Sequence, residues 1–85
     1  MRKERSFISY ERKALVYHVI YKQTASSLIH CTLLCLNNSA CKSVNFISQV
    51  GKEEGQCELN DATAKDFPMH LFLSVDSTHA DANDL

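Results

Sequence analysis

The four cysteines are the strongest constraint on what this chain can fold into. They lie within one 27-residue segment of an 85-residue sequence, at Cys31, Cys35, Cys41 and Cys57. A domain this small buries too little apolar surface to be stable on packing alone, so an even, clustered set of cysteines indicates two disulfides. Because disulfides persist outside the cytosol, we expect an extracellular or secreted protein. Residues 14–21 lack the apolar stretch and cleavage site of a signal peptide, so we expect a fragment of a longer secreted precursor, or a true start other than Met1.

Four cysteines allow three pairings, and their spacing favours one of them. A helical pattern carries Cys31 and Cys35, and a strand pattern begins at Cys41. Only five residues separate Cys35 from Cys41, so the end of the helix lies near the start of the strand, and we expect a short bridge between them. Cys31 lies one turn back on the same face and would reach Cys57 on a returning strand. A bridge between Cys31 and Cys35 would leave the helix unattached and is least favoured.

Zinc binding is the main alternative for these thiols, with His18 or His30 as further ligands. Structural zinc sites present paired ligands two to four residues apart on tight turns. Only Cys31 and Cys35 approach this spacing, and they belong to a helical pattern; the other two cysteines are sixteen residues apart. The C-x-x-C redox motif does not occur either. We therefore expect no metal and no cofactor, and keep a small intracellular zinc- or thiol-bearing domain as the less favoured alternative.

Composition and motifs exclude several functional classes. The formal net charge of −1 gives no basic face for nucleic acid, and no run of about 18 apolar residues could span a membrane. Gly51 and Gly55 are the only glycines, too few for a glycine-rich phosphate loop. No G-x-S-x-G or H-E-x-x-H motif occurs, and we interpret Glu53, Glu54 and Glu58 as solvated charges rather than an acid/base pair. We therefore expect no enzymatic activity.

Charge and periodicity divide the chain into three parts. Residues 1–13 carry five basic and two acidic side chains, a net charge of +3, and we expect a flexible basic leader. Residues 75–85 carry three aspartates, a net charge of −3, with few large apolar side chains, and we expect an acidic disordered tail. Residues 14–74 mix helical and strand periodicity and are expected to form one α+β domain.

The first two elements of this domain are predicted from a change of period. Residues 14–22 carry β-branched and aromatic side chains on both faces, which predicts a strand with His18 partly buried in it. Residues 24–38 predict a short amphipathic helix, with hydroxyl side chains to cap its start and two asparagines to end it. Its apolar stripe contains Leu28 and Leu34, and three further side chains widen the stripe: Ile29, Leu33 and Leu36.

The remaining elements are strands. Residues 41–47 and 56–60 predict a hairpin around the polar loop 48–55, and residues 69–74 predict a last strand that closes the sheet. Alternation in the hairpin places Val44, Phe46 and Leu59 on one face. We expect these three side chains to form the core beneath the helix, with Leu28 and Leu34 above them.

The segment SLIHCTLLCLNNSACKSVNFISQVGKEEGQCELND resembles the core of a PAN/apple domain. The similarity consists of a helix with C-x-x-x-C, a strand that opens with a cysteine and runs to an aromatic residue (CKSVNF), a variable loop, and a Cys-x-Leu strand (CELN). It covers residues 14–60 well and residues 61–74 weakly. The extra cysteine pair that joins the termini of fuller apple modules is absent.

The resemblance implies an antiparallel sheet with one helix across it and the same nested disulfides. It also implies a non-catalytic extracellular module that binds a protein or a glycan. We further expect a monomeric module with no nucleic-acid partner and no membrane span. A structural fragment of a larger mosaic protein, without a ligand of its own, is the alternative. Ligand residues follow no motif in this family, so none is transferred.

Two surface sites are predicted from local sequence. Asn37 begins an N-x-S sequon where the helix is expected to end, so it can carry a glycan in a secretory pathway. A glycan on Asn37 would cover that face of the domain and prevent a partner from binding to it. We therefore expect the binding surface elsewhere, on the loop that carries Lys52, Glu53 and Glu54.

Overall fold

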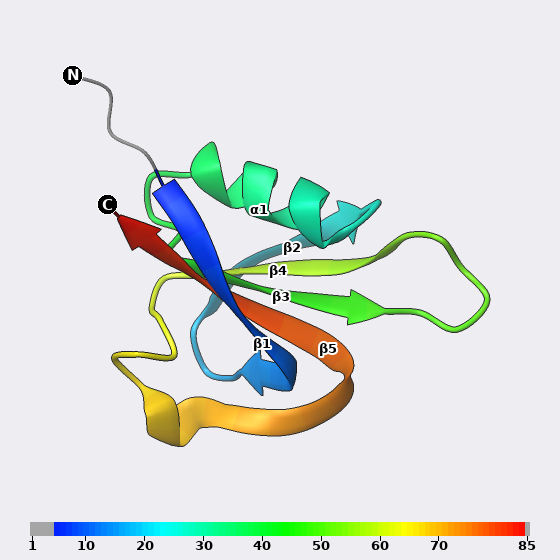
Figure 1. Cartoon of the computed structure of the whole chain (residues 1–85). Coiled ribbons are helices and arrows are strands. Elements are labelled where there is room, and N and C mark those ends of the chain that lie inside the picture. Colours follow the sequence, from blue (N-terminus) through cyan, green and yellow to red (C-terminus); the bar gives the residue numbers. More distant parts are fainter. Residues whose placement is uncertain (1–4, 85) are drawn as a thin grey trace.

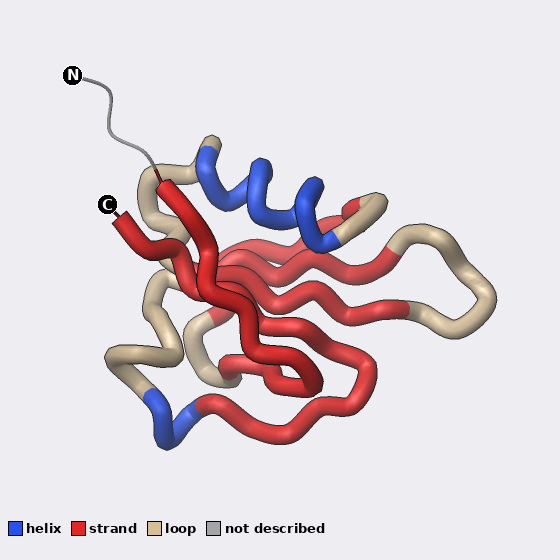
Figure 2. Tube along the Cα trace, in the orientation of Figure 1, coloured by secondary structure: helices blue, strands red, loops and turns tan. Residues whose placement is uncertain are grey.

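The computed structural model describes residues 5–84, which form one antiparallel sheet with a helix across it (Figure 1). The elements follow in the order β1 (Arg5–Leu15), β2 (Val19–Ala25), α1 (Leu28–Leu36), β3 (Ser43–Ser48), β4 (Gly55–Asn60), the 3-10 turn η1 (Pro68–His70) and β5 (Leu71–Asp84). In space the strands are ordered β1-β5-β3-β4-β2, and every pairing is antiparallel. Figure 2 shows the strands in red with the helix in blue across them. The α+β class expected from the sequence is confirmed.

The two ends of the chain form strands, which corrects the expected division into leader, domain and tail. Residues 5–13 belong to β1 and residues 75–84 belong to β5, and the two strands pair from Arg5 with Asp84 to Leu15 with Leu71. The sheet therefore extends well beyond residues 14–74. The tail contains few large apolar side chains, so it was expected to be disordered. It forms a strand nevertheless, because β5 lies between β1 and β3 and its backbone is hydrogen-bonded to both. Residues 1–4 and 85 of the two expected segments lie outside the described residues.

The first predicted strand is divided into two. Residues 14–22 were expected to be continuous, whereas β1 ends at Leu15 and β2 begins at Val19. Tyr17 between them has a φ of 75°, in the left-handed region that strands do not use. His18 thus lies in a turn rather than within a strand. A few residues before this turn, the register between β1 and β5 shifts between Glu11 and Lys13, and Arg12 at this irregularity has a φ of 60°.

The helix covers one face of the sheet and packs over β3 and β4 (Figure 1). Ser27 caps its start, because its hydroxyl accepts a hydrogen bond from the His30 N–H, and Asn37 ends it. The core cluster beneath consists of Ala25, the four cysteines, Val44, Leu59 and Ala80. Leu28, Leu34 and Phe46 are partly buried against this cluster, so the expected core is confirmed.

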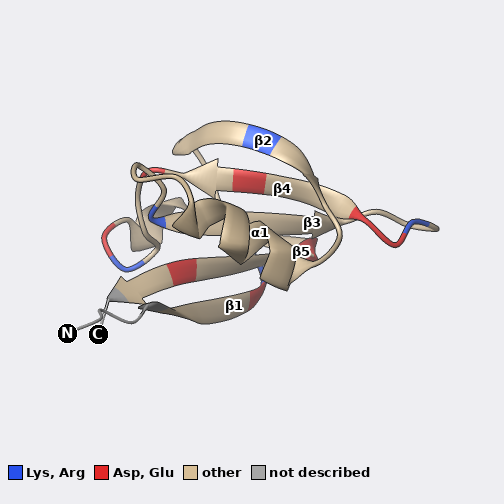
Figure 3. Ribbon diagram, turned by 90° about the horizontal axis from the view of Figure 1, so that it is seen from above, with Lys and Arg blue, Asp and Glu red and all other residues tan. Residues whose placement is uncertain are grey.

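Three helix residues expected in the apolar stripe face solvent instead. Ile29, Leu33 and Leu36 are 73%, 52% and 40% exposed. In a nine-residue helix that packs across one face of a sheet, only about one side of the cylinder can reach the core, and Cys31 and Cys35 occupy that side. The opposite side is uncharged as well as apolar, as the view onto α1 shows (Figure 3).

Candidate binding surfaces

Two disulfides attach the helix to the sheet. Cys31 of α1 bonds to Cys57 of β4, with 5.5 Å between the Cα atoms, and Cys35 bonds to Cys41, with 5.3 Å between the Cα atoms. This is the nested pairing expected from the sequence. All four side chains are buried, so the bridges are part of the core rather than of a reactive surface.

The two predicted surface sites lie where the sequence placed them. The loop that carries Lys52, Glu53 and Glu54 joins β3 to β4 and extends from the sheet, with charged positions in blue and red (Figure 3). All three side chains are exposed. Together with Ser26 they line an open concavity of about 500 Å³. Asn37 is exposed at the end of α1. A role in binding for the loop, and a glycan on Asn37, stay predictions.

The face of the sheet opposite the helix carries a set of buried polar side chains that sequence reasoning missed. They are Ser43, Asn45, Asn60, Ser77, His79 and Asp81, each at most 4% exposed. Residues 61–67 fold over this face. Ser43 donates a hydrogen bond to the Ala62 carbonyl (2.6 Å), and the backbone N–H groups of Ala64 and Lys65 donate to Asp81 (2.8 and 3.1 Å).

Asn45 and His79 connect this polar face to the end of β1. The Asn45 side-chain amide accepts from the Leu15 N–H (2.9 Å) and donates to the Leu15 carbonyl (2.8 Å). These two bonds fix which way the amide is turned, so its oxygen faces His79 Nδ1 at 2.7 Å. The other ring nitrogen, Nε2, lies 2.6 Å from Asp81 Oδ1. His79 on β5 therefore joins Asn45 on β3 to Asp81, which in turn binds the covering loop.

The Asp81 carboxylate is stabilised in its ionised form. Burial alone would raise the pKa of Asp81, but the hydrogen bonds from His79, Ala64 and Lys65 together outweigh it, and the pKa lies below its usual value. At neutral pH the carboxylate accepts every one of these hydrogen bonds. It therefore holds the loop of residues 61–67 against the sheet.

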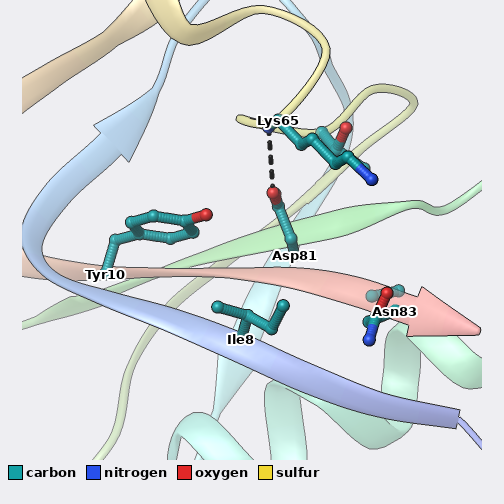
Figure 4. A pocket seen from close by; sticks show the side chains of 7 residues that line it. Ile8, Tyr10, Lys65, Asp81 and Asn83 are labelled. Carbon is teal, nitrogen blue, oxygen red and sulfur yellow. Dashed lines mark hydrogen bonds between the residues drawn. The ribbon is translucent and has the colours of Figure 1, made fainter.

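A small pocket of about 130 Å³ opens between this loop and the paired ends of β1 and β5 (Figure 4). Its lining residues are Ile8, Tyr10, Thr63, Lys65, Asp81, Ala82 and Asn83. Tyr10 stands on one side of Asp81, Lys65 and Asn83 stand on the other, and Ile8 lies below (Figure 4). The pocket thus combines one aromatic ring with a cation, an amide and a hydroxyl.

His18 belongs to an aromatic cluster beside this loop, with partners that the sequence did not place near it. Its Nε2 atom lies 2.9 Å from His70 Nδ1, and its Nδ1 atom lies 3.9 Å from a carboxylate oxygen of Asp61. Phe67 packs against both rings, with centroids 4.4 Å from His18 and 5.6 Å from His70. The cluster ties the turn between β1 and β2 to η1.

Neither a metal centre nor a membrane span is found in the part of the chain that the structure describes. No three His, Cys, Asp or Glu side chains there converge as metal ligands. No helix over residues 5–84 is long and apolar enough to cross a membrane.

The model of the PAN domain family matches residues 5–82. The chain belongs to the PAN domain family. The match begins in β1 and ends in β5, so both terminal strands are part of the PAN domain. Comparison with curated proteins and with solved structures gave no match.

Membership gives the coarse functional class of this PAN domain. The family consists of disulfide-rich modules that commonly mediate protein or carbohydrate interactions and are generally non-catalytic, and two disulfides are typical of extracellular proteins. The terminal cysteine pair of fuller apple modules is absent from this PAN domain, and the β1–β5 ladder joins its termini instead.

The sequence carries one signal for the buried polar face that borders the pocket. Ser77, His79 and Asp81 alternate along the expected tail. Alternating polar residues usually indicate a solvated strand face. Here the hydrogen-bonding side chains at every second position of β5 lie on the face of the sheet that residues 61–67 cover.

Proposed function

We propose that this PAN domain is a non-catalytic extracellular module that binds a protein or carbohydrate ligand in the pocket between β1, β5 and residues 61–67. The observation that carries the proposal is the fixed floor of the pocket. Asp81 accepts hydrogen bonds from two backbone N–H groups of the loop and lies in hydrogen-bond contact with His79. The covering loop is therefore held in place before any ligand binds. A site held in place before binding loses less conformational freedom on binding.

The rim of the pocket supports recognition of a polar ligand. Tyr10 offers an apolar ring with a polar end, and the exposed Lys65 and the amide of Asn83 offer donors. Such a mixture of one aromatic surface and a few placed polar groups is typical of ligand sites. The concavity around Lys52, Glu53 and Glu54 is the competing location, because it is larger, but no hydrogen bond to the sheet is found for these three side chains among the described residues.

A binding screen with paired variants tests the proposal. The oxidised domain is displayed as a multimer on an array of glycans and of extracellular protein domains, and the same array is probed with two variants. Tyr10→Ser should abolish the signals, whereas a variant with Lys52, Glu53 and Glu54 all changed to Ser should retain them. The opposite result would move the site to the β3–β4 loop. An array without any signal would favour a structural fragment that has no ligand.

A further inference from the structure

The buried His79–Asp81 pair is neutral as a whole, so it does not cancel the positive charge of Lys65 in the pocket. The Asn45 side-chain oxygen, whose orientation is fixed by the bonds to Leu15, can only accept a hydrogen bond. His79 Nδ1 must therefore carry a proton and donate it to that oxygen. The 2.6 Å contact between Nε2 and Oδ1 requires one further proton between those two atoms. Because the Asp81 carboxylate is ionised, that proton belongs to the ring, and the ring and the carboxylate sum to zero charge.

Lys65 supplies the remaining charge of the pocket. It is exposed, and over residues 6–83 no ion pair involves its ammonium group. The other lining residues, apart from Asp81, are uncharged: Ile8, Tyr10, Thr63, Ala82 and Asn83. The pocket therefore carries one net positive charge on a chain whose total formal charge is −1. A single small anion suits it better than a long polyanion, which the acidic remainder of the chain would repel.

Size and shape narrow the ligand further. A volume of about 130 Å³ is well below the roughly 300–1,000 Å³ of sites for drug-sized molecules, so it admits about one small ring. The ring of Tyr10 can cover the apolar side of such a ligand, and Asn83 and the hydroxyls of Thr63 and Tyr10 can bond to its hydroxyl groups. Lys65 then faces an anionic substituent.

We propose that the pocket takes a single sugar ring that bears a carboxylate, with Tyr10 against the ring and Lys65 on the carboxylate. The inference rests on the proposed function and names the ligand class of that site. A sugar is favoured over a peptide because the pocket lies on the face of the sheet and is closed by residues 61–67. An extended peptide would instead pair with a free strand edge, and the edges of this sheet are β1 and β2.

Titrations followed by amide chemical shifts test the proposal at pH 7 with the oxidised chain. The probes are sodium glucuronate, glucose, sodium acetate and a blocked peptide with one aspartate. We expect glucuronate to shift the amides of residues 63–65 and 81–83. Glucose, which lacks the carboxylate, should bind up to about fivefold more weakly, and acetate, which lacks the ring, should also bind more weakly than glucuronate.

Paired variants separate the role of the charge from that of the fold. Lys65→Gln should remove the preference for glucuronate over glucose, while its backbone N–H still bonds to Asp81. Lys52→Gln, in the loop between β3 and β4, is the matched control and should change nothing. An unchanged amide spectrum outside the pocket shows that both variants fold.

Several results would overturn the inference. Equal binding of glucose and glucuronate would remove the role of Lys65, and glucuronate shifts confined to residues 52–54 would refute the location. Stronger binding of the aspartyl peptide than of glucuronate would replace the sugar with a protein ligand. If no sugar binds while the array still gives signals that depend on Tyr10, the ligand class is wrong and the proposed function stands. Loss of both refutes the two together.

Discussion

Substitution of Asp81 by Asn tests whether the buried polar face stabilises the fold. The amide has the shape of the carboxylate but replaces one acceptor oxygen with a donor. Asp81 Oδ1 faces His79 and the Ala64 N–H, and Oδ2 faces the Lys65 N–H. Whichever way the new amide turns, at least one loop N–H loses its acceptor and His79 loses its carboxylate.

The expected loss is a large part of the total stability. A buried donor without a partner costs about 1–3 kcal/mol, and removal of one member of a buried charge pair costs about 3–5 kcal/mol. These costs overlap, so we expect a loss of about 3–4 kcal/mol. A domain of this length has a total of roughly 4–13 kcal/mol, at about 0.05–0.15 kcal/mol per residue. The thermal midpoint should fall by about 12–30 °C.

The pH dependence distinguishes this mechanism from a general packing defect. The pKa of Asp81 is lower in the folded state than in the unfolded chain, where it is about 3.9. Its contribution is therefore complete above about pH 5 and is lost as the pH falls through the folded-state pKa. Urea unfolding of both proteins, with disulfides intact, should show a full gap in free energy at pH 5 that narrows below pH 4.

Asp76→Asn is the matched control, because Asp76 lies on the same strand and is exposed. It should change the free energy of unfolding by less than about 0.5 kcal/mol. If Asp81→Asn unfolds within that same margin of the wild type, the carboxylate does not hold the loop. A gap that stays constant down to pH 2 would show that its ionisation is irrelevant.

Three further predictions concern the core, the disulfides and the surface. Phe46→Ala should cost about 2–3 kcal/mol in urea unfolding, less than a fully buried Phe because this ring is partly exposed; Val50→Ala, at a 98% exposed position, is the control, and equal midpoints would place Phe46 outside the core. Replacement of Cys31 and Cys57 by Ser should destabilise by about 3.5 kcal/mol and replacement of Cys35 and Cys41 by about 2.4 kcal/mol, since the longer loop restricts the unfolded chain more; the reverse order would contradict the chain-entropy argument. Expression behind a signal peptide in eukaryotic cells should add a glycan at Asn37 that a glycosidase removes, and a mass unchanged by the enzyme and equal to that of Asn37→Gln would refute its use.

The sequence specifies the central part of this domain through local signals. The expected hydroxyl and asparagine caps are Ser27 and Asn37, although the helix begins at Leu28, four residues after the expected start, because Thr24 and Ala25 belong to β2. Cysteine spacing predicts both bridges. The hairpin of β3 and β4 follows from strict alternation on both sides of a polar loop. Each of these signals depends on residues close in sequence, where periodicity and spacing are informative.

The rest of the fold depends on pairing between distant residues. β1 and β5 join the two ends of the chain, and no local pattern reports that a polar strand has partners on both sides. Likewise, His79 and Asp81 look solvated in sequence because their partners, Asn45 and the Ala64 N–H, lie 34 and 17 residues away. The candidate site was missed for this reason, since two of its three walls come from the segments expected to be a flexible leader and a disordered tail.

The pairing of Arg5 with Asp84 determines how the domain would respond to a pulling force. Both ends of the chain leave the sheet at the same place (Figure 1), so tension applied to them opens β1 and β5 one hydrogen-bonded pair at a time rather than shearing the whole ladder. The peeling would stop at the Cys31–Cys57 bridge, which locks the segment between those cysteines. At about 3.4 Å per residue, the extended length is limited to roughly 180 Å instead of about 270 Å for the reduced chain. Under tension the pocket, whose walls are β1 and β5, would open first, while the helix and the hairpin beneath it stay folded.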